Sequence, residues 1–345
     1  MKNLYLFFIG GMVLLLHCSS RGCKASDCQP NTISTITVDI SGHGNFTSVQ
    51  SAIDFVPEGN TQWIRIQISP GKYSEKVAIP VNKSCIFLDG AGRELTSIEW
   101  GDHEETHTSA TFTSYPDNIV AKGIKFKNTY NLPDGLNKID IMKEELIWKQ
   151  AVAARILGDK CAFYECGFVG LQDTLWDEEG RHYFNSCYIE GSVDFIFGQG
   201  QSIYEGCEIS VNIGRFAPGV TGYITAQRKQ QPQDSNGFVF KNCNISGTGT
   251  VDLGRAWGPY STVVFYNSTM SDVIAPEGWN AWNFVNHEAN FTYVEEDNKG
   301  PGADTSKRVP WEKKLDPNEL QKFLNMSYVD EDGWLSKTPD LTFYY

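Results

Sequence analysis

The sequence predicts an all-β protein: a single-stranded parallel β-helix, a solenoid, with loops and short helices attached. Val, Ile, Thr, Phe and Tyr occur throughout, with 32 glycines and 14 prolines, a mixture that favours many short strands joined by turns. One phrase also returns along the chain, as FYECGF around Cys166, FNSCYI around Cys187, IYEGCEI around Cys207 and VFKNCNI around Cys243. These cysteines are 21, 20 and 36 residues apart, and a repeat of this length that holds short alternating strands is typical of a solenoid.

The repeat predicts which side chains lie above one another. In a parallel β-helix each coil buries one row of side chains, and strands of neighbouring coils lie about 4.8 Å apart. The recurring cysteines are therefore expected to form an internal column. They can be buried free thiols, which pack well, or disulfides between neighbouring coils, and both alternatives stay open. No paired CxxC spacing occurs, so no metal site is expected.

The N-terminus has the pattern of a signal peptide. Lys2 precedes an apolar stretch from Leu4 to Leu16, and small and polar residues follow it. The stretch is shorter than the roughly 20 apolar residues that a membrane anchor needs. We therefore expect residues 1–24 to be a cleaved signal peptide and residues 25–345 to form one β-helix domain.

Two further features agree with secretion. Asn-x-Ser/Thr acceptors occur at Asn45, Asn82, Asn244, Asn267, Asn290 and Asn325. Of the nine cysteines, Cys18 would leave with the signal, and the other eight would meet an oxidising compartment, where disulfides are possible. Their connectivity does not follow from sequence. The chain is predicted to be an extracellular glycoprotein.

The charge excludes some partners. A formal net charge of −13 argues against a broad basic surface that holds nucleic acid. No second apolar run is long enough to span a bilayer, so no membrane partner is expected. A polymer whose carboxylates are masked stays compatible with this charge.

The spacing of the coils also relates four polar residues. Asp173 and Asp194 are 21 residues apart, and Gln150 and Gln172 are 22 apart. Two carboxyls on adjacent coils cannot both ionise cheaply, so one is expected to keep its proton and the two can act as nucleophile and general acid. The amides beside them could stabilise an oxyanion. The alternative is that these residues sit at turns between coils, which would suit one Asp better than a matched pair.

The stretch LGRAW adds a cation and a ring. Arg255 could hold Asp194 ionised through a charge-assisted hydrogen bond, which would explain a carboxylate inside the apolar run VDFIFG. Trp257 offers a flat face on which a sugar ring could rest, although a core position is a real alternative.

Two further patterns lie outside this set of polar residues. HEETH, from His103 to His107, matches a zinc-protease motif, but its Gly-, Ser- and Thr-rich surroundings show no helical period. In a strand the two histidines would lie roughly 13 Å apart, so no zinc site is expected. The segment from Lys138 to Lys149 is predicted to be a short helical insertion. The Gly-x-Ser-x-Gly elbow of serine esterases is absent.

Five motifs together resemble the plant pectin methylesterases (pectinesterases). They are GKYSEK with Gly71, Tyr73 and Glu75, QAVA from Gln150, QDTL from Gln172, DFIFG from Asp194 and LGRAW from Leu253, in the family's order between Ile33 and Leu335. The resemblance implies a right-handed parallel β-helix that hydrolyses methyl esters of homogalacturonan in the cell wall and releases methanol. No cofactor is expected. The sequence resembles the short form, without an inhibitor-like pro-region.

The resemblance also implies roles for residues. Asp194 would be the nucleophile, Asp173 the general acid and then base, and Arg255 the group that positions Asp194. Gln150 and Gln172 would stabilise the oxyanion, and the substrate would also contact Trp257, Phe197 and Thr106, besides Gln150 and Arg255. LGRAW replaces the family's LGRPW, and Trp176 replaces the Tyr of QDTLY.

The expected partner is methyl-esterified homogalacturonan, bound by a monomer, and a proteinaceous pectinesterase inhibitor is a second candidate partner. Two rival interpretations use the same scaffold. A β-helical polysaccharide hydrolase or lyase would also use paired carboxylates, and a cell-wall lectin would bind pectin without cleaving it.

Overall fold

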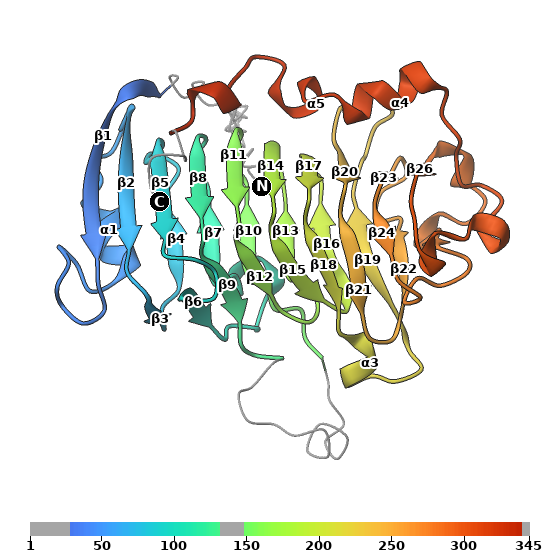
Figure 1. Ribbon diagram of the computed structural model, residues 1–345, viewed down its shortest axis with the longest axis horizontal. Coiled ribbons are helices and arrows are strands. Elements are labelled where there is room, and N and C mark those ends of the chain that lie inside the picture. Colours follow the sequence, from blue (N-terminus) through green and yellow to red (C-terminus); the bar gives the residue numbers. More distant parts are fainter. Residues whose placement is uncertain (1–27, 132–147, 340–345) are drawn as a thin grey trace, which may run out of the picture.

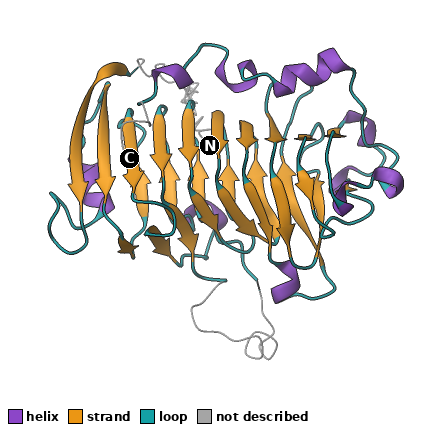
Figure 2. Ribbon diagram, in the orientation of Figure 1, coloured by secondary structure: helices purple, strands orange, loops and turns teal. Residues whose placement is uncertain are grey.

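The computed structural model describes residues 28–131 and 148–339, whose coils stack along one axis and form three parallel-stranded sheets that run along it (Figure 1). From β2 to β25, successive strands pass from sheet A to sheet B to sheet C and back to sheet A, so each of these coils contributes one strand to each sheet, and β1 and β26 extend sheet A at its two ends. Every strand pair in these sheets is parallel. The predicted parallel β-helix is confirmed, and Figure 2 shows how few helices accompany the strands.

The strands have the following bounds. Sheet A contains β1 (Gln29–Val38), β2 (Gln62–Ile68), β5 (Ile86–Gly90), β8 (Ile119–Lys122), β11 (Cys161–Tyr164), β14 (Arg181–Asn185), β17 (Gln201–Glu205), β20 (Gly237–Lys241), β23 (Thr262–Tyr266) and β26 (Thr292–Glu296). Sheet B contains β3 (Gly71–Tyr73), β6 (Thr96–Trp100), β9 (Lys125–Asn128), β12 (Gly167–Val169), β15 (Tyr188–Gly191), β18 (Glu208–Val211), β21 (Asn244–Gly247) and β24 (Thr269–Met270). Sheet C contains β4 (Val77–Ile79), β7 (Phe112–Ser114), β10 (Ala154–Ile156), β13 (Leu175–Asp177), β16 (Val193–Gly198), β19 (Thr221–Gln227), β22 (Thr250–Arg255) and β25 (Trp279–Asn280).

Short helices decorate the coils. The α-helices are α1 (Val49–Phe55), α3 (Ile213–Phe216), α4 (Pro317–Leu324) and α5 (Ser327–Asp330). The 3₁₀ helices are η1 (Thr106–Thr108), η2 (Trp282–Phe284), η3 (Glu288–Asn290), η4 (Pro301–Ala303), η5 (Thr305–Lys307) and η6 (Leu335–Lys337). None of the helices in the described residues is long and apolar enough to cross a membrane. Residues 1–24 and most of the insertion expected between Lys138 and Lys149 lie outside the described residues.

The core is a set of ladders in which identical kinds of side chain stack from coil to coil. On sheet A the rings of Phe184, Tyr204, Phe240 and Phe265 lie on register partners, with centroids 4.5–4.6 Å apart. Such stacking removes large apolar surfaces from water, and it gives each coil contacts only with its neighbours. The register of the repeat therefore determines which side chains meet.

The recurring cysteines form the expected column as free thiols. Cys166, Cys187, Cys207 and Cys243 are all buried and none of them is in a disulfide. Burial raises the pKa of the Cys166 thiol to about 12, so this thiol stays protonated near neutral pH. Of the two alternatives left open by the sequence, the structure has the buried thiols.

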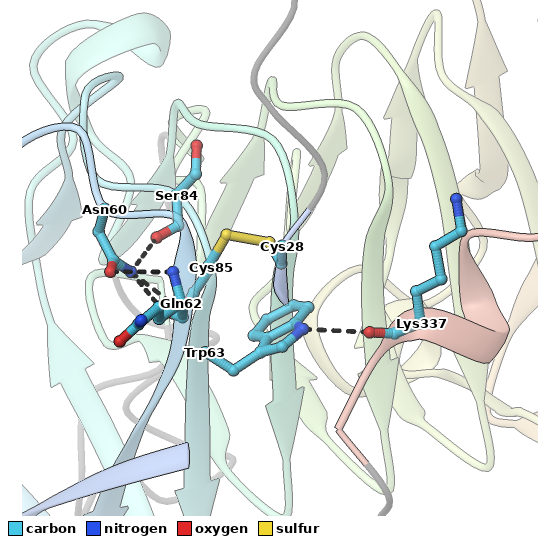
Figure 3. Close-up of a disulfide and its surroundings, with 7 residues drawn as sticks. All are labelled: Cys28, Asn60, Gln62, Trp63, Ser84, Cys85 and Lys337. Atoms are coloured by element: carbon cyan, nitrogen blue, oxygen red, sulfur yellow. Dashed lines mark hydrogen bonds between the residues drawn. A yellow bond between two sulfur atoms is a disulfide. The ribbon is translucent and has the colours of Figure 1, made fainter. Parts of the chain in front are cut away.

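A disulfide does occur at the first coils, where the sequence did not specify a pair. Cys28 and Cys85 are bonded across 57 residues and join the start of β1 to the start of β5 (Figure 3). Beside this bond the indole Nε1 of Trp63 donates to the carbonyl oxygen of Lys337, at 3.1 Å (Figure 3). The first coils and the C-terminal segment are thus held together.

The C-terminal segment packs along the outer face of sheet A. Leu320 and Leu324 of α4 and Val329 of α5 form an apolar cluster with residues of β17, β20, β23 and β26. Further along, Trp334 packs with Cys28, Cys85 and their neighbours at the opposite end of the solenoid. In Figure 1 this segment, coloured red, runs across the coils from the last strands toward the first.

Two sequence motifs have structural positions. In GKYSEK, the Glu75 carboxylate accepts from the backbone N–H groups of Val49 and Gln50, at 2.7 and 3.0 Å, and so caps the N-terminus of α1. In HEETH, His103 lies in a loop and His107 in η1, so the two histidines do not share one α-helical face. Within the described ranges, no group of three or more metal-ligating side chains gathers.

The six asparagines of the Asn-x-Ser/Thr acceptor sites are all exposed.

Candidate functional site

The two aspartates lie on adjacent coils of sheet C, as their spacing predicts. Gln172 and Val193 are register partners, and the Asp173 backbone N–H donates to the Val193 carbonyl oxygen at 3.1 Å. Both aspartates have left-handed backbone conformations, with φ of 61° at Asp173 and 48° at Asp194. Non-glycine residues rarely adopt this conformation, and they do so mainly where the surroundings impose it. The chain thus bends at both positions, and the two carboxyls are almost fully buried.

Arg255 contacts one of these two carboxyls. Its Nε donates to Oδ1 of Asp194 at 2.8 Å, and its Nη2 donates to Oδ2 at 2.5 Å. This fork-to-fork arrangement is the strongest common form of ion pair. The contact predicted from VDFIFG and LGRAW is therefore present, and it gives the carboxylate inside the apolar run a partner.

The two carboxyls consequently differ in acidity. Burial and the negative charge of Asp194 together raise the pKa of Asp173 well above its usual range, against a smaller opposing effect of Arg255. Burial also raises the pKa of Asp194, but here the hydrogen bonds and charge of Arg255 oppose the rise directly. When the two carboxyls together hold one proton, that proton is on Asp173, and Asp194 is ionised. The pair can therefore supply a carboxylate and a carboxylic acid at the same time.

The two glutamines lie beside this pair on neighbouring coils. The Ala151 N–H donates to the Gln172 carbonyl oxygen at 3.2 Å, which places the Gln150 and Gln172 segments one above the other. Thr106 Oγ1 donates to Gln150 Oε1 at 2.7 Å. This hydrogen bond fixes the amide oxygen of Gln150, so its amide N–H groups can donate to a different acceptor. A cleft of about 330 Å³ is lined by His103, Glu104, Glu105, Thr106, Trp148, Lys149, Gln150 and Gln172. The structure thus brings together Gln150, Gln172 and Thr106.

Three aromatic side chains, called here the aromatic row, continue from the aspartates across sheet C. Trp176 and Phe197 are register partners with stacked rings 5.1 Å apart, and the Trp257 ring lies 5.9 Å from Phe197. Phe197 is only 4% exposed, whereas Trp176 and Trp257 are half-buried. Trp176 and Trp257 are therefore the more exposed rings of the aromatic row, and arginine guanidinium groups lie over both of them, Arg155 over Trp176 and Arg228 over Trp257.

The sequence reasoning missed two rings that contact Arg255. The guanidinium carbon lies 3.8 Å from the centroid of the Trp282 ring and 4.3 Å from that of Tyr223. Stacking of this kind favours a guanidinium held in a fixed plane. Tyr223 lies in β19 as the register partner of Asp252 in β22, so the coil spacing could have placed it near Arg255. Trp282 lies in η2, outside the repeating strands, so no spacing could have placed it there.

Comparison with known proteins gives a consistent result. A family model described as Pectinesterase matches residues 35–332. The chain is 50% identical over 304 residues to "Probable pectinesterase 29" of Arabidopsis thaliana, covering 88% of this chain and 89% of that one. It is 49% identical over 316 residues to "Probable pectinesterase 55" of the same plant, covering 90% and 94%.

Solved structures with the same architecture are also similar. A pectin methylesterase from carrot superposes with a TM-score of 0.80 at 31% identity, covering 91% of this chain and 98% of that one. A pectin methylesterase from Aspergillus niger gives a TM-score of 0.74 at 26% identity, covering 92% and 100%.

Proposed function

The chain belongs to the pectinesterase family and hydrolyses methyl esters of pectin, and we propose that Asp194 is its nucleophile and Asp173 its general acid and base. One observation carries this assignment. Of two buried carboxyls on adjacent coils, Arg255 makes hydrogen bonds to Asp194, while the pKa of Asp173 is raised well above its usual range. A carboxylate nucleophile and a carboxylic acid proton donor are what a two-step ester hydrolysis requires.

In the first step, an ionised oxygen of Asp194 attacks the ester carbonyl carbon and a tetrahedral oxyanion forms. The amide N–H groups of Gln150 and Gln172 donate to this oxyanion, and such donors stabilise the charge that develops in the transition state. The bond to the methoxy oxygen then breaks as Asp173 gives that oxygen its proton. Methanol leaves, and the uronate acyl group stays on Asp194 as a mixed anhydride.

In the second step, Asp173 is a carboxylate and acts as a base. It takes a proton from a water molecule, whose oxygen attacks the acyl carbon of the anhydride. The bond to Asp194 breaks and returns the electron pair to its carboxylate, which Arg255 stabilises. The product is a uronic acid carboxyl, which loses its proton to solvent and becomes a uronate, and Asp173 again holds a proton, so the site is restored.

The proposed substrate is methyl-esterified homogalacturonan, lying over sheet C. The exposed parts of Trp176 and Trp257 would contact its sugar rings, and Thr106 would orient Gln150. We further propose that residues 1–24 direct secretion, that the mature monomer acts in the cell wall, and that a proteinaceous pectinesterase inhibitor is its candidate protein partner.

The test is methanol release from highly esterified pectin by the purified mature protein. Asp194→Asn, which keeps the shape of the side chain, is expected to abolish methanol release while the circular dichroism spectrum and melting temperature show a folded protein. Full residual activity in this variant would end the assignment of the nucleophile. New reducing ends or unsaturated sugars without methanol would instead support a polysaccharide hydrolase or lyase, and binding without any product would support a lectin.

A further inference from the structure

A fully buried serine lies between the two segments that carry Thr106 and Gln150. The Ser109 hydroxyl donates to the carbonyl oxygen of Thr106 at 3.0 Å, and it accepts from the backbone N–H of Val152 at 3.1 Å. Ser109 has no exposed surface, so water does not compete for these two contacts. Ser109 therefore joins η1, which begins at Thr106, to the segment that follows Gln150.

These contacts close a ring. On the side of the cleft, Thr106 Oγ1 donates to Gln150 Oε1 at 2.7 Å. On the side of the core, Ser109 connects the Thr106 carbonyl oxygen to the N–H of Val152, which is two residues after Gln150. The Gln150 amide is thus held through its own oxygen and through the backbone that carries it. A donor directed at a developing charge needs such a fixed orientation.

The buried amide of Asn128 supports this ring from sheet B. Asn128 ends β9 and is only 1% exposed. Its Nδ2 lies 2.9, 3.3 and 3.1 Å from the carbonyl oxygens of Asp102, Ser109 and Val152. Its Oδ1 accepts from the N–H of Tyr130 at 2.9 Å. The loop before η1 and the segment before β10 are therefore attached to one buried amide.

The alternative is that Ser109 only fills the core, and the chain contains a serine with which to compare it. Ser268 is also fully buried, and its hydroxyl donates to the Tyr266 carbonyl oxygen at 3.1 Å and accepts from the Cys243 N–H at 3.1 Å. Ser268 lies between β23 and β24, where the chain passes from sheet A to sheet B. Ser109 differs from it because its contact leads to Thr106, which lines the cleft.

We propose that Ser109 is a positioning residue for the reaction: it fixes Thr106 against the segment of Gln150, so that the Gln150 amide N–H groups are directed at the oxyanion. This inference rests on the proposed function, in which Gln150 donates to the tetrahedral oxyanion. Ser109 is buried and does not touch the substrate. Because the oxyanion exists only at the transition state and the intermediate, the effect of Ser109 falls mainly on kcat and little on KM.

The experiment measures kcat and KM for methanol release from highly esterified pectin. Gln150→Ala removes the donor and is expected to lower kcat about 10²-fold. Ser109→Ala leaves the donor in place without fixing it, and should lower kcat roughly tenfold, with KM changed less than about twofold. Thr106→Val removes the hydroxyl that holds Gln150 and should lower kcat by a similar factor. In the double variant Ser109→Ala, Thr106→Val, kcat should stay at the value of Thr106→Val, because both changes open the same ring.

The matched control is Ser268→Ala, which removes the same two kinds of contact from a buried serine on the other side of the solenoid. It should lower the melting temperature as much as Ser109→Ala does and leave kcat at the wild-type value. Ser109→Cys keeps a weak donor and acceptor at this position, so its kcat should lie between those of wild type and Ser109→Ala. This variant makes the same test if Ser109→Ala does not fold.

Three results would overturn the proposal. They are an unchanged kcat in Ser109→Ala, effects of Ser109→Ala and Thr106→Val that multiply in the double variant, and a loss of kcat in Ser268→Ala as large as that in Ser109→Ala. Each would mean that Ser109 acts on stability alone or by a route that does not pass through Thr106. An unchanged kcat in Gln150→Ala would instead contradict the proposed role of Gln150, on which this inference depends.

Discussion

Arg255 donates two parallel hydrogen bonds to the Asp194 carboxylate, at 2.8 and 2.5 Å, although the two residues are 61 positions apart in the sequence. The two side chains come from β22 and β16, which are separated by β19, so the pair spans two coil intervals of sheet C. The same guanidinium is stacked between Tyr223 and Trp282. The acidity of one aspartate thus depends on side chains from three other segments, and this dependence can be tested.

Replacement of Arg255 should raise the pKa of Asp194 and lower activity. Removing one partner of a buried ion pair typically costs about 3–5 kcal/mol, and if that cost falls on the transition state, kcat/KM of Arg255→Gln falls roughly 200- to 5,000-fold. Because Asp194 must be ionised to attack, the acid limb of the pH profile of kcat/KM should move to higher pH. Arg255→Lys keeps the positive charge but loses the two parallel hydrogen bonds, so its kcat/KM should lie between those of wild type and Arg255→Gln. An unshifted acid limb in Arg255→Gln would contradict this role.

The rings of Tyr223 and Trp282 should act as positioning residues through Arg255. Tyr223→Phe keeps the stacked ring and should keep most activity, whereas Tyr223→Leu loses a cation–π contact of about 1 kcal/mol and should lose about fivefold in kcat/KM. The diagnostic readout is the acid limb, which should move to higher pH in Tyr223→Leu and not in Tyr223→Phe. A general loss of stability with a normal pH profile would mean that the ring only fills space.

The raised pKa of Asp173 should lower the free energy of unfolding at neutral pH. Its folded-state pKa is raised, so the folded protein holds a proton that the unfolded chain releases above about pH 4. Stability is therefore expected to decrease as the pH rises from the unfolded pKa toward the folded one. Asp173→Asn, which stays neutral, should melt at a higher temperature than wild type at pH 7 and at the same temperature at pH 3. It should also lose about 10²–10⁴-fold in kcat.

The Cys28–Cys85 disulfide should contribute to stability and leave the chemistry alone. A bond that closes 57 residues removes about 4 kcal/mol of unfolded-state entropy in the chain-closure account. In the double variant Cys28→Ser, Cys85→Ser, the free energy of unfolding measured by denaturant titration should fall by this amount, and kcat/KM at 25 °C should stay at the wild-type value. A matching loss of kcat/KM would show that the first coils communicate with sheet C.

The sequence predicted those parts of the site that follow from coil spacing. Because parallel coils keep their register, the 21-residue interval placed Asp173 and Asp194 on neighbouring coils, and the 22-residue interval did the same for Gln150 and Gln172. Trp282 and Arg228 could not be predicted in this way, since they lie outside the repeating strands, in η2 and after β19. Their positions depend on connections whose length varies from coil to coil.

Burial and pairing were also beyond the sequence. Phe197 is expected to contact sugar, and the sequence did not indicate that it is only 4% exposed beside its register partner Trp176. The Cys28–Cys85 pair depends on where β1 meets the coil, which no spacing rule states. The left-handed conformation of both aspartates had no sequence signal, because other residue types adopt it at equivalent bends.

The C-terminal segment has a consequence for how the chain is made. A solenoid of this kind can begin to stack from its first coil as soon as that coil leaves the ribosome, because each coil contacts only its neighbours. Here the segment that carries Leu320, Val329 and Trp334 follows the coils in the sequence and packs back across them to the first ones. The coils are thus expected to assemble before this segment can cover them, and to reach their full resistance to proteases only after it has been synthesised and has packed.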